Sequence, residues 1–133
     1  MKNVNYTYAQ TSFTNRHLYP DRGHVNVYMH RAIIWCPDGR EIDHIDGNQL
    51  DNRKHNLRSV DKAQNQWNRK EPINNTSGSK GVSWSGGKWV VEIVVRGKKY
   101  CLGRTSNMIN ATIAYRLASK VLHGEYSVYW RKK

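Results

Sequence analysis

Residues 41–70 have the sequence EIDHIDGNQLDNRKHNLRSVDKAQNQWNRK, in which two short segments with aliphatic residues flank a polar, turn-prone stretch. Glu41–Ile45 and Leu57–Val60 each have the length and composition of a short strand. Asp61 is a favourable N-cap for a helix over residues 62–70. The segment therefore predicts two strands joined by a loop and followed by a helix.

The same segment carries side chains that suit phosphodiester hydrolysis, which needs a base to activate water and a cation to neutralise charge. His44 suits the base because imidazole is half-neutral near physiological pH. Asp43 and Asn65 offer hard oxygen ligands, which favour Mg²⁺ or Mn²⁺ over zinc. Neighbouring strand residues point to opposite faces, so His44 can face a cleft while Asp43 faces the helix. Taken alone, an Asp-His pair is more often a pair of surface residues. Asn56 alone is more often an ordinary turn residue, and Asn65 a solvated position on a helix. The prediction of an active site therefore depends on the spacing of all these residues together.

The spacing of these residues resembles that of the HNH homing endonucleases, whose catalytic unit is a ββα-metal fold. The resemblance covers roughly residues 25–66 and is carried by Val27-Tyr28-Met29-His30-Arg31, Asp43-His44-Ile45-Asp46-Gly47-Asn48, Asp51-Asn52, Asn56-Leu57-Arg58 and Asn65. It implies that His44 is the general base and that Asp43 and Asn65 ligate the metal. It also implies that Asn56 is the middle residue of the HNH triplet and holds the strand and the loop by hydrogen bonds.

The third residue of the triplet is Asn65 rather than His, a departure that is common in the phage-like branch of the family. This departure implies a single metal other than zinc. The cysteine pairs that bind zinc in some relatives are absent, since Cys36 and Cys101 lie far apart with no CxxC partner. We therefore expect Mg²⁺ or Mn²⁺ as the cofactor and no zinc.

Three further residues of this half leave alternatives open. His30 and Arg31 match a His-Arg pair of the family, whose role is packing under the ββα unit or a phosphate contact, and we favour packing. Arg58 can clamp a phosphate with its guanidinium group or can be a solvated side chain. We include Arg58 among the expected DNA contacts.

The chain of 133 residues carries a formal charge of +12, with a pI near 10.0, and the charge is unevenly placed. Residues 1–71 hold 11 Lys/Arg and 8 Asp/Glu, a net of +3, whereas residues 72–133 hold 11 and 2, a net of +9. A basic excess of this size indicates a polyanion partner, nucleic acid before an anionic membrane. Because the sequence has no apolar run of membrane-spanning length and no signal-peptide pattern, we expect a cytoplasmic protein without a membrane partner.

The composition changes at Glu71-Pro72-Ile73-Asn74-Asn75-Thr76-Ser77-Gly78-Ser79, which predicts a linker. The expected organisation is an HNH nuclease domain at 1–71, a linker at 72–79, an Apetala-type DNA-binding domain at 80–126 and a basic tail at 127–133. Within the second domain, the pattern predicts three antiparallel strands over residues 81–84, 88–96 and 99–103, and a helix over 107–123.

Residues 80–126 resemble the Apetala-type DNA-binding domain of plant ethylene-response factors, which also occurs fused to HNH nucleases. The resemblance is carried by Lys80-Gly81-Val82, Gly87-Lys88-Trp89-Val90-Val91-Glu92-Ile93, Leu102-Gly103, Ala111 to Ala118 and Gly124. It implies that the sheet enters the major groove of duplex DNA and that the helix packs behind it. Ser83, Val94 and Cys101 stand where relatives carry Arg and Trp, so individual base contacts do not transfer.

Alternation along residues 88–96 divides the central strand into two faces. We expect the apolar face to pack on the helix, with these residues in contact: Trp89, Val91, Ile93 and Val95 from the strand, and Ala111, Ala114, Tyr115 and Ala118 from the helix, which also has Leu122 at an apolar position. We expect the opposite face and its rim to contact DNA through Lys80, Lys88, Glu92, Val94, Arg96, Lys98, Lys99 and Arg104.

These patterns together predict an α+β protein, in which an N-terminal ββα-metal nuclease unit precedes a three-stranded antiparallel sheet packed on one helix. The predicted function is a metal-dependent endonuclease of homing type, which hydrolyses duplex DNA by nicking or double-strand cleavage and acts as a monomer. One alternative is a catalytically inactive DNA-binding regulator, against which Asp43, His44 and the two Asn residues of the motif argue. Another is an RNA-binding or RNA-cutting protein, which would favour exposed aromatic residues on the sheet.

Overall fold

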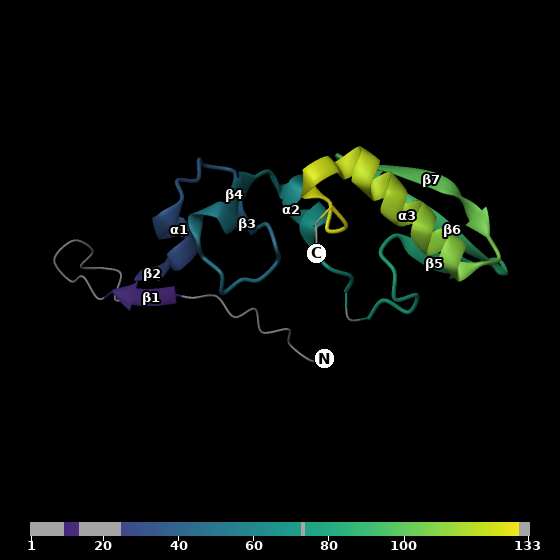
Figure 1. Ribbon diagram of the computed structural model, residues 1–133, viewed down its shortest axis with the longest axis horizontal. Helices are drawn as coiled ribbons and strands as arrows, with labels where there is room; N and C mark the ends of the chain where they lie inside the picture. The colour runs from purple at the N-terminus through teal and green to yellow at the C-terminus, as the bar shows by residue number, and fades with distance from the viewer. Residues whose placement is uncertain (1–9, 14–24, 73, 131–133) are drawn as a thin grey trace. The chain divides into compact units, whose positions relative to one another are not determined.

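The computed structural model describes residues 10–13, 25–72 and 74–130, and the chain forms two compact units, Met1–Asp61 and Lys62–Lys133 (Figure 1). The division falls before the predicted helix rather than in the predicted linker, so this helix belongs to the second unit. The mixture of helices and antiparallel sheets confirms the α+β class. In the part of the chain that the structure describes, every helix falls short of the length and hydrophobicity that a membrane crossing needs.

The first unit contains two small antiparallel sheets. Its elements in chain order are β1 (Gln10–Phe13), β2 (Val25–Tyr28), α1 (Met29–Ile33), β3 (Glu41–His44), the 3₁₀ turn η1 (Lys54–Asn56) and β4 (Leu57–Val60). β1 pairs with β2, and β3 pairs with β4 in a register that places His44 opposite Leu57. The two strands predicted around the polar loop are therefore confirmed, with the first one residue shorter than expected.

The buried side chains of the first unit are mostly polar. Leu57 and Val60 are its buried aliphatic residues among those described, whereas the buried polar residues are His30, Asp43, His44, Asn52 and Asn56. A polar group loses its hydration on burial and stays buried at low cost only when it is hydrogen-bonded. The centre of this unit is therefore a polar cluster held together by specific partners.

The second unit is a three-stranded sheet covered on one face by a long helix (Figure 1). Its elements are α2 (Lys62–Asn68), β5 (Val82–Ser85), β6 (Lys88–Val95), β7 (Lys98–Thr105), α3 (Met108–His123) and the 3₁₀ turn η2 (Gly124–Tyr126). β6 is the central strand, antiparallel to both neighbours. Asn107 caps α3, because its side-chain oxygen accepts hydrogen bonds from the amides of Ile109 and Asn110.

The core of the second unit lies between β6 and α3. It consists of Val82, Val91, Ile93, Ala111 and Tyr115, with Trp89, Ala118 and Tyr129 packed against it. The predicted strand register is therefore right for Val91 and Ile93, and Val94 on the other face is exposed. The alternation along residues 88–96 also predicts that Val90 lies on the open face, beside Lys88 and Glu92, but Val90 is buried. It occupies a central-strand position between Ser83 of β5 and Arg104 of β7, so its cross-strand neighbours cover this small side chain.

The face of α3 that packs on the sheet differs from the prediction at four positions. Ala114 and Leu122 are exposed, whereas Ser119 and His123 are buried. The buried residues follow one another at intervals of four, from Ala111 through Tyr115 to His123, which is the spacing of one helix face. The prediction selected apolar residue types and so missed the two polar members of this face.

Gly81 is a position where the backbone requires glycine. Its φ is +68°, and a Cβ built on it would overlap the ring of Tyr115 and the carbonyl of Glu92. The close approach allows the amide of Glu92 to donate to the carbonyl of Gly81 at 2.8 Å. Gly81 thus lets the segment before β5 lie against both β6 and α3.

Within the second unit, Lys80 and an aromatic stack hold α2 against the other elements. The ammonium of Lys80 donates to the carbonyls of Gln66, Trp67 and Arg69 at 2.8, 3.3 and 3.0 Å. These carbonyls lie at the C-terminal end of α2, where the helix has acceptors without intrahelical donors and a partial negative charge. The ring of Trp67 stacks on that of His123, with centroids 4.3 Å apart.

A buried hydrogen-bond chain continues from this stack into the sheet. His123 Nε2 lies 3.0 Å from the carbonyl oxygen of Val94, so Nε2 carries the proton and Nδ1 accepts from the Ser119 hydroxyl at 3.1 Å. Ser119 Oγ in turn accepts from Ser127 Oγ at 2.7 Å. Burial is the main reason that the pKa of His123 is lowered, which keeps its ring neutral in this chain.

Candidate active site

His44 lies at the end of β3 and is buried beside the loop that connects β3 to β4. Its Nε2 is 3.1 Å from Oδ1 of Asn52, which is also buried. The amide nitrogen of Asn52 donates to the carbonyl of Leu50 at 3.3 Å, so the oxygen of the amide faces the histidine. Since Oδ1 can only accept, Nε2 carries the proton and the lone pair of the neutral ring is on Nδ1.

Asn56 closes the loop that carries these residues. Its Oδ1 accepts from the amide of Asp46 at 3.0 Å, and its Nδ2 donates to Asp46 Oδ1 and to the carbonyl of Asp51, both at 2.9 Å. Its backbone carbonyl also accepts from the amide of Ile45 at 2.8 Å. One buried side chain therefore joins the start, the middle and the end of the loop.

The loop is further stiffened by side chains that accept from the backbone two residues ahead. Asp46 accepts from the amide of Asn48 at 2.7 Å, and Asn48 accepts from that of Leu50 at 3.1 Å. Asp51 is bonded to the guanidinium of Arg53, and this hydrogen bond is the main cause that lowers the pKa of Asp51 to about 2. The loop is thus fixed before any substrate binds.

Asp43 is paired with Arg58 across the β3–β4 ladder. Nε and Nη2 of Arg58 donate to the same carboxylate oxygen, Oδ2 of Asp43, at 2.9 and 2.8 Å. Both side chains are largely buried, at 7% exposure for Asp43 and 15% for Arg58. The structure therefore places Arg58 on a carboxylate inside the unit, an arrangement that neither of the two sequence interpretations included.

His30 lies next to His44. The two rings meet edge to face with centroids 5.6 Å apart. The ring of Tyr28 stacks on that of His30, with centroids 5.7 Å apart. Burial, followed by the charges of His44 and Arg31, lowers the pKa of His30. The packing role favoured for His30 agrees with this position, whereas Arg31 is exposed.

A hard divalent cation fits the donor set better than a soft one. The sequence-predicted ligands are Asp43 of β3, a carboxylate, and Asn65 of α2, an amide that belongs to the second unit. Mg²⁺ is commonly held by one or two protein oxygens and several waters. In residues 10–13, 25–72 and 74–130, no three His, Cys, Asp or Glu side chains gather as a metal-binding group. A cation on Asp43 would share the carboxylate with Arg58.

Residues 35–67 match the HNH endonuclease family, a range that includes the whole β3–β4 loop. The chain is also 37% identical over 108 residues to Protein 3.8 of Escherichia phage T7, across 80% of this chain and 88% of that protein. The chain belongs to the family of phage T7 Protein 3.8. No solved structure matches it. The HNH domain supports nuclease activity in general, implies a nucleic-acid substrate and belongs to a class that uses divalent metal ions.

The HNH match gives the β3–β4 loop a chemical meaning that the sequence predicted only in part. The motif contains Asn52, but the sequence assigned no role to it, and in the structure its Oδ1 lies 3.1 Å from Nε2 of His44. The available signal was a second Asn placed inside the loop before Asn56. A side chain eight residues from His44 could be paired with it only once the path of the loop was known.

Apart from Arg58, which lies in the first unit, the residues expected to contact DNA lie on the second unit and, with one exception, are open to solvent. Val94, Lys88, Arg96, Lys98, Lys99 and Arg104 are exposed. Glu92 is partly exposed and pairs with Lys99 at 3.2 Å. Lys80 is the exception, because its ammonium is used by the carbonyls of α2, and burial lowers its pKa to about 8. The ammonium of Lys80 is thus bound within the second unit, and a contact of Lys80 with DNA stays a prediction.

Proposed function

We propose that this chain is a metal-dependent endonuclease of homing type that hydrolyses phosphodiester bonds of duplex DNA, with His44 as the general base. The observation that carries the proposal is the buried hydrogen bond between His44 Nε2 and Asn52 Oδ1. It leaves Nδ1 as the basic nitrogen in an HNH domain whose loop is fixed in advance. A histidine held in one tautomer is suited to accept a proton from water.

In the proposed reaction, His44 Nδ1 takes a proton from the attacking water as the water oxygen bonds to phosphorus. The ester P–O bond then breaks, the leaving oxygen takes a proton from a solvent water, and His44 releases its proton to solvent. Asn52 stabilises the imidazolium that forms, because its Oδ1 continues to accept from Nε2. Asn56 keeps the loop closed, so the position of His44 does not depend on the substrate.

Asp43 and Asn65 are the proposed metal ligands. The divalent ion would supply charge neutralisation at the scissile phosphate and at the leaving oxygen. Arg58 contributes by fixing the carboxylate of Asp43 through its two hydrogen bonds. We retain Mg²⁺ or Mn²⁺ as the proposed cofactor on the oxygen chemistry of these ligands.

The second unit is the proposed DNA-binding module, of Apetala type. β6, β7 and their connecting turn carry exposed cations, of which Lys99 and Arg104 pair with Val94 and Val90 of the face that α3 leaves open, and residues 72–133 hold a net charge of +9. A sheet face of this kind can enter a major groove while its cations contact phosphates. With one HNH domain in each chain, a monomer would cut one strand in each binding event.

A plasmid-nicking assay tests the proposal. The wild-type chain should convert supercoiled plasmid to nicked circles with Mg²⁺ or Mn²⁺ and should be inactive with EDTA. His44→Ala should lose activity by a factor on the order of 10²–10⁴, with DNA affinity in a gel-shift assay unchanged. His55→Ala is the matched control, because His55 is an exposed histidine of η1. This variant should nick the plasmid at the wild-type rate.

Two outcomes would contradict the proposal. If His44→Ala cut at a rate close to wild type, a different group would be the base. If the wild-type chain bound duplex DNA but did not cut it with either metal, the alternative of a catalytically inactive DNA-binding regulator would be correct.

A further inference from the structure

The outer face of α3 carries a row of exposed aliphatic side chains. They occur at every fourth residue and are Ile109, Ile113, Leu117 and Val121, with exposures of 69, 49, 60 and 82%. Residues four apart lie one above the other on a helix, so these four form a continuous stripe. The stripe runs from Ile109 to Val121, which is about 18 Å along the helix axis at a rise of about 1.5 Å per residue.

α3 is therefore apolar on two opposite faces. Its inner face packs Ala111 and Tyr115 into the core of the sheet, while the stripe points the other way. A helix with one solvated side normally has charged or polar residues there, and a helix that is apolar all round is normally covered on both sides. A contiguous exposed apolar patch of this kind marks a site of interaction with another protein.

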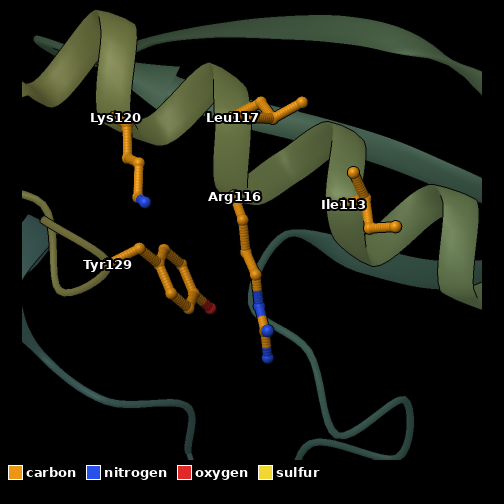
Figure 2. A pocket seen from close by; sticks show the side chains of 5 residues that line it. All are labelled: Ile113, Arg116, Leu117, Lys120 and Tyr129. Atoms are coloured by element: carbon orange, nitrogen blue, oxygen red, sulfur yellow. The ribbon is translucent and has the colours of Figure 1, made fainter. Parts of the chain in front are cut away.

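The stripe is bordered by positive charge and by a groove. The groove has a volume of about 300 Å³ and is lined by Ile113, Arg116, Leu117, Lys120 and Tyr129 (Figure 2). Figure 2 shows the side chains of Arg116 and Lys120 extending from α3 toward the side on which Tyr129 lies. The guanidinium of Arg116 lies over the ring of Tyr129 at 5.3 Å, which holds this cation beside the groove.

The charge around the stripe favours an acidic partner over a second copy of the chain. α3 contains Arg116 and Lys120 and has no Asp or Glu in residues 108–123. A second copy packed on the stripe would bring these cations against their own counterparts, between two modules that each carry a net of +9 over residues 72–133. Like charges at an interface oppose association, whereas opposite charges favour it.

We propose that the outer face of α3 binds an acidic amphipathic helix of another protein. The aliphatic face of that helix would cover the stripe, and one of its Asp or Glu side chains would enter the groove between Arg116 and Lys120. A helix of about three to four turns matches the length of the stripe. This interaction is separate from the proposed cleavage of DNA and does not depend on it.

The test uses three fluorescein-labelled synthetic peptides and the full chain, with binding measured by fluorescence anisotropy. The first peptide is an amphipathic helix with Leu along one face and Glu along its borders. The second has Lys in place of each Glu, and the third has the composition of the first in a scrambled order. The first should bind, and the other two should bind at least about tenfold more weakly.

Two variants locate the site on α3. Leu117→Glu and Arg116→Glu should each weaken binding of the first peptide by about tenfold or more. Leu117→Glu places an acid in the apolar stripe, and Arg116→Glu reverses the charge at its border. Both side chains are exposed, so the fold should be kept, which a wild-type midpoint of each variant in urea unfolding would verify. Lys98→Glu, a charge-matched change on β7, should leave binding of the peptide unchanged.

Three results would overturn the proposal. Equal binding of the scrambled peptide would show an attraction of charge alone, without use of the stripe. No binding of the first peptide at millimolar concentration would show that the face does not accept such a helix. Self-association of the full chain in analytical ultracentrifugation, abolished by Leu117→Glu, would show that a second copy covers the stripe.

Discussion

Asn52→Ala would remove the oxygen that accepts the hydrogen bond from His44 Nε2, and the structure gives the size of the effect. The bond is 3.1 Å long and buried, so the variant leaves a buried N–H without its acceptor. Such a loss costs about 1–3 kcal/mol of stability. Because the ring is then free to rotate and to exchange tautomers, nicking should slow by about 10–100-fold, as for other groups that orient an active-site histidine.

Asn52→Asp separates an orienting role from a merely structural one. Its carboxylate can accept the same hydrogen bond, so the tautomer is kept, but its negative charge favours the protonated ring over the neutral ring that acts as the base. Activity should therefore fall at neutral pH and recover as the pH increases. The acid limb of the pH–rate profile should therefore move to higher pH in Asn52→Asp.

The assay is single-turnover nicking of supercoiled plasmid across the pH range, with DNA affinity measured in parallel. Asn74→Ala is the matched control, because Asn74 is an exposed asparagine outside the loop. The reasoning would be refuted if Asn52→Ala nicked at the wild-type rate. It would also be refuted if Asn52→Asp kept the wild-type pH profile, since the contact would then have no influence on the base.

Three other predictions concern stability. Ile93→Ala should cost about 2–5 kcal/mol in urea unfolding because Ile93 is fully buried in the core; a cost below about 1 kcal/mol would contradict the core assignment. Lys80→Met should destabilise the end of α2 and raise amide exchange there, whereas Lys88→Met, at an exposed position, should not; equal exchange in both variants would contradict the anchoring role. The folded chain resists protonation of His30 and His123, whose pKa values lie below 6.5, while the unfolded chain takes up these protons. Stability should therefore fall as the pH drops below about 6.5. A midpoint of urea unfolding that stayed constant from pH 8 to pH 5 would contradict the lowered pKa values of the two histidines.

The sequence was most informative where local pattern determines structure. The strand at residues 57–60 was predicted with the correct bounds, and the alternation along β6 correctly placed Val91 and Ile93 in the core. In both places the side-chain period of two must agree with burial, so the pattern carries the information. The same alternation gave the wrong environment for Val90, because cross-strand neighbours rather than the strand itself cover that residue.

Partners that lie apart in the sequence could not be predicted. Arg58 can bind a phosphate, water or a carboxylate, and only the pairing of β3 with β4 brings it to Asp43. The amide of Asn52 similarly reaches His44 through the path of the loop. Ser119 and His123 are polar residues on a buried helix face, and a search for apolar periodicity cannot find such residues when they satisfy one another.

The attachment of α2 to the second unit has a consequence for anyone who wishes to build hybrid nucleases from this chain. A transplant that takes the proposed DNA-binding module from residue 80 onward, as its sequence boundary suggests, would separate Lys80 from the three carbonyls to which it donates and His123 from Trp67. The graft would then carry a half-buried ammonium without acceptors and an exposed polar network. A cut between Asp61 and Lys62 keeps these contacts intact and transfers Asn65 with the module. An exchange of target preference in this family would therefore also exchange part of the metal-binding chemistry proposed for the nuclease.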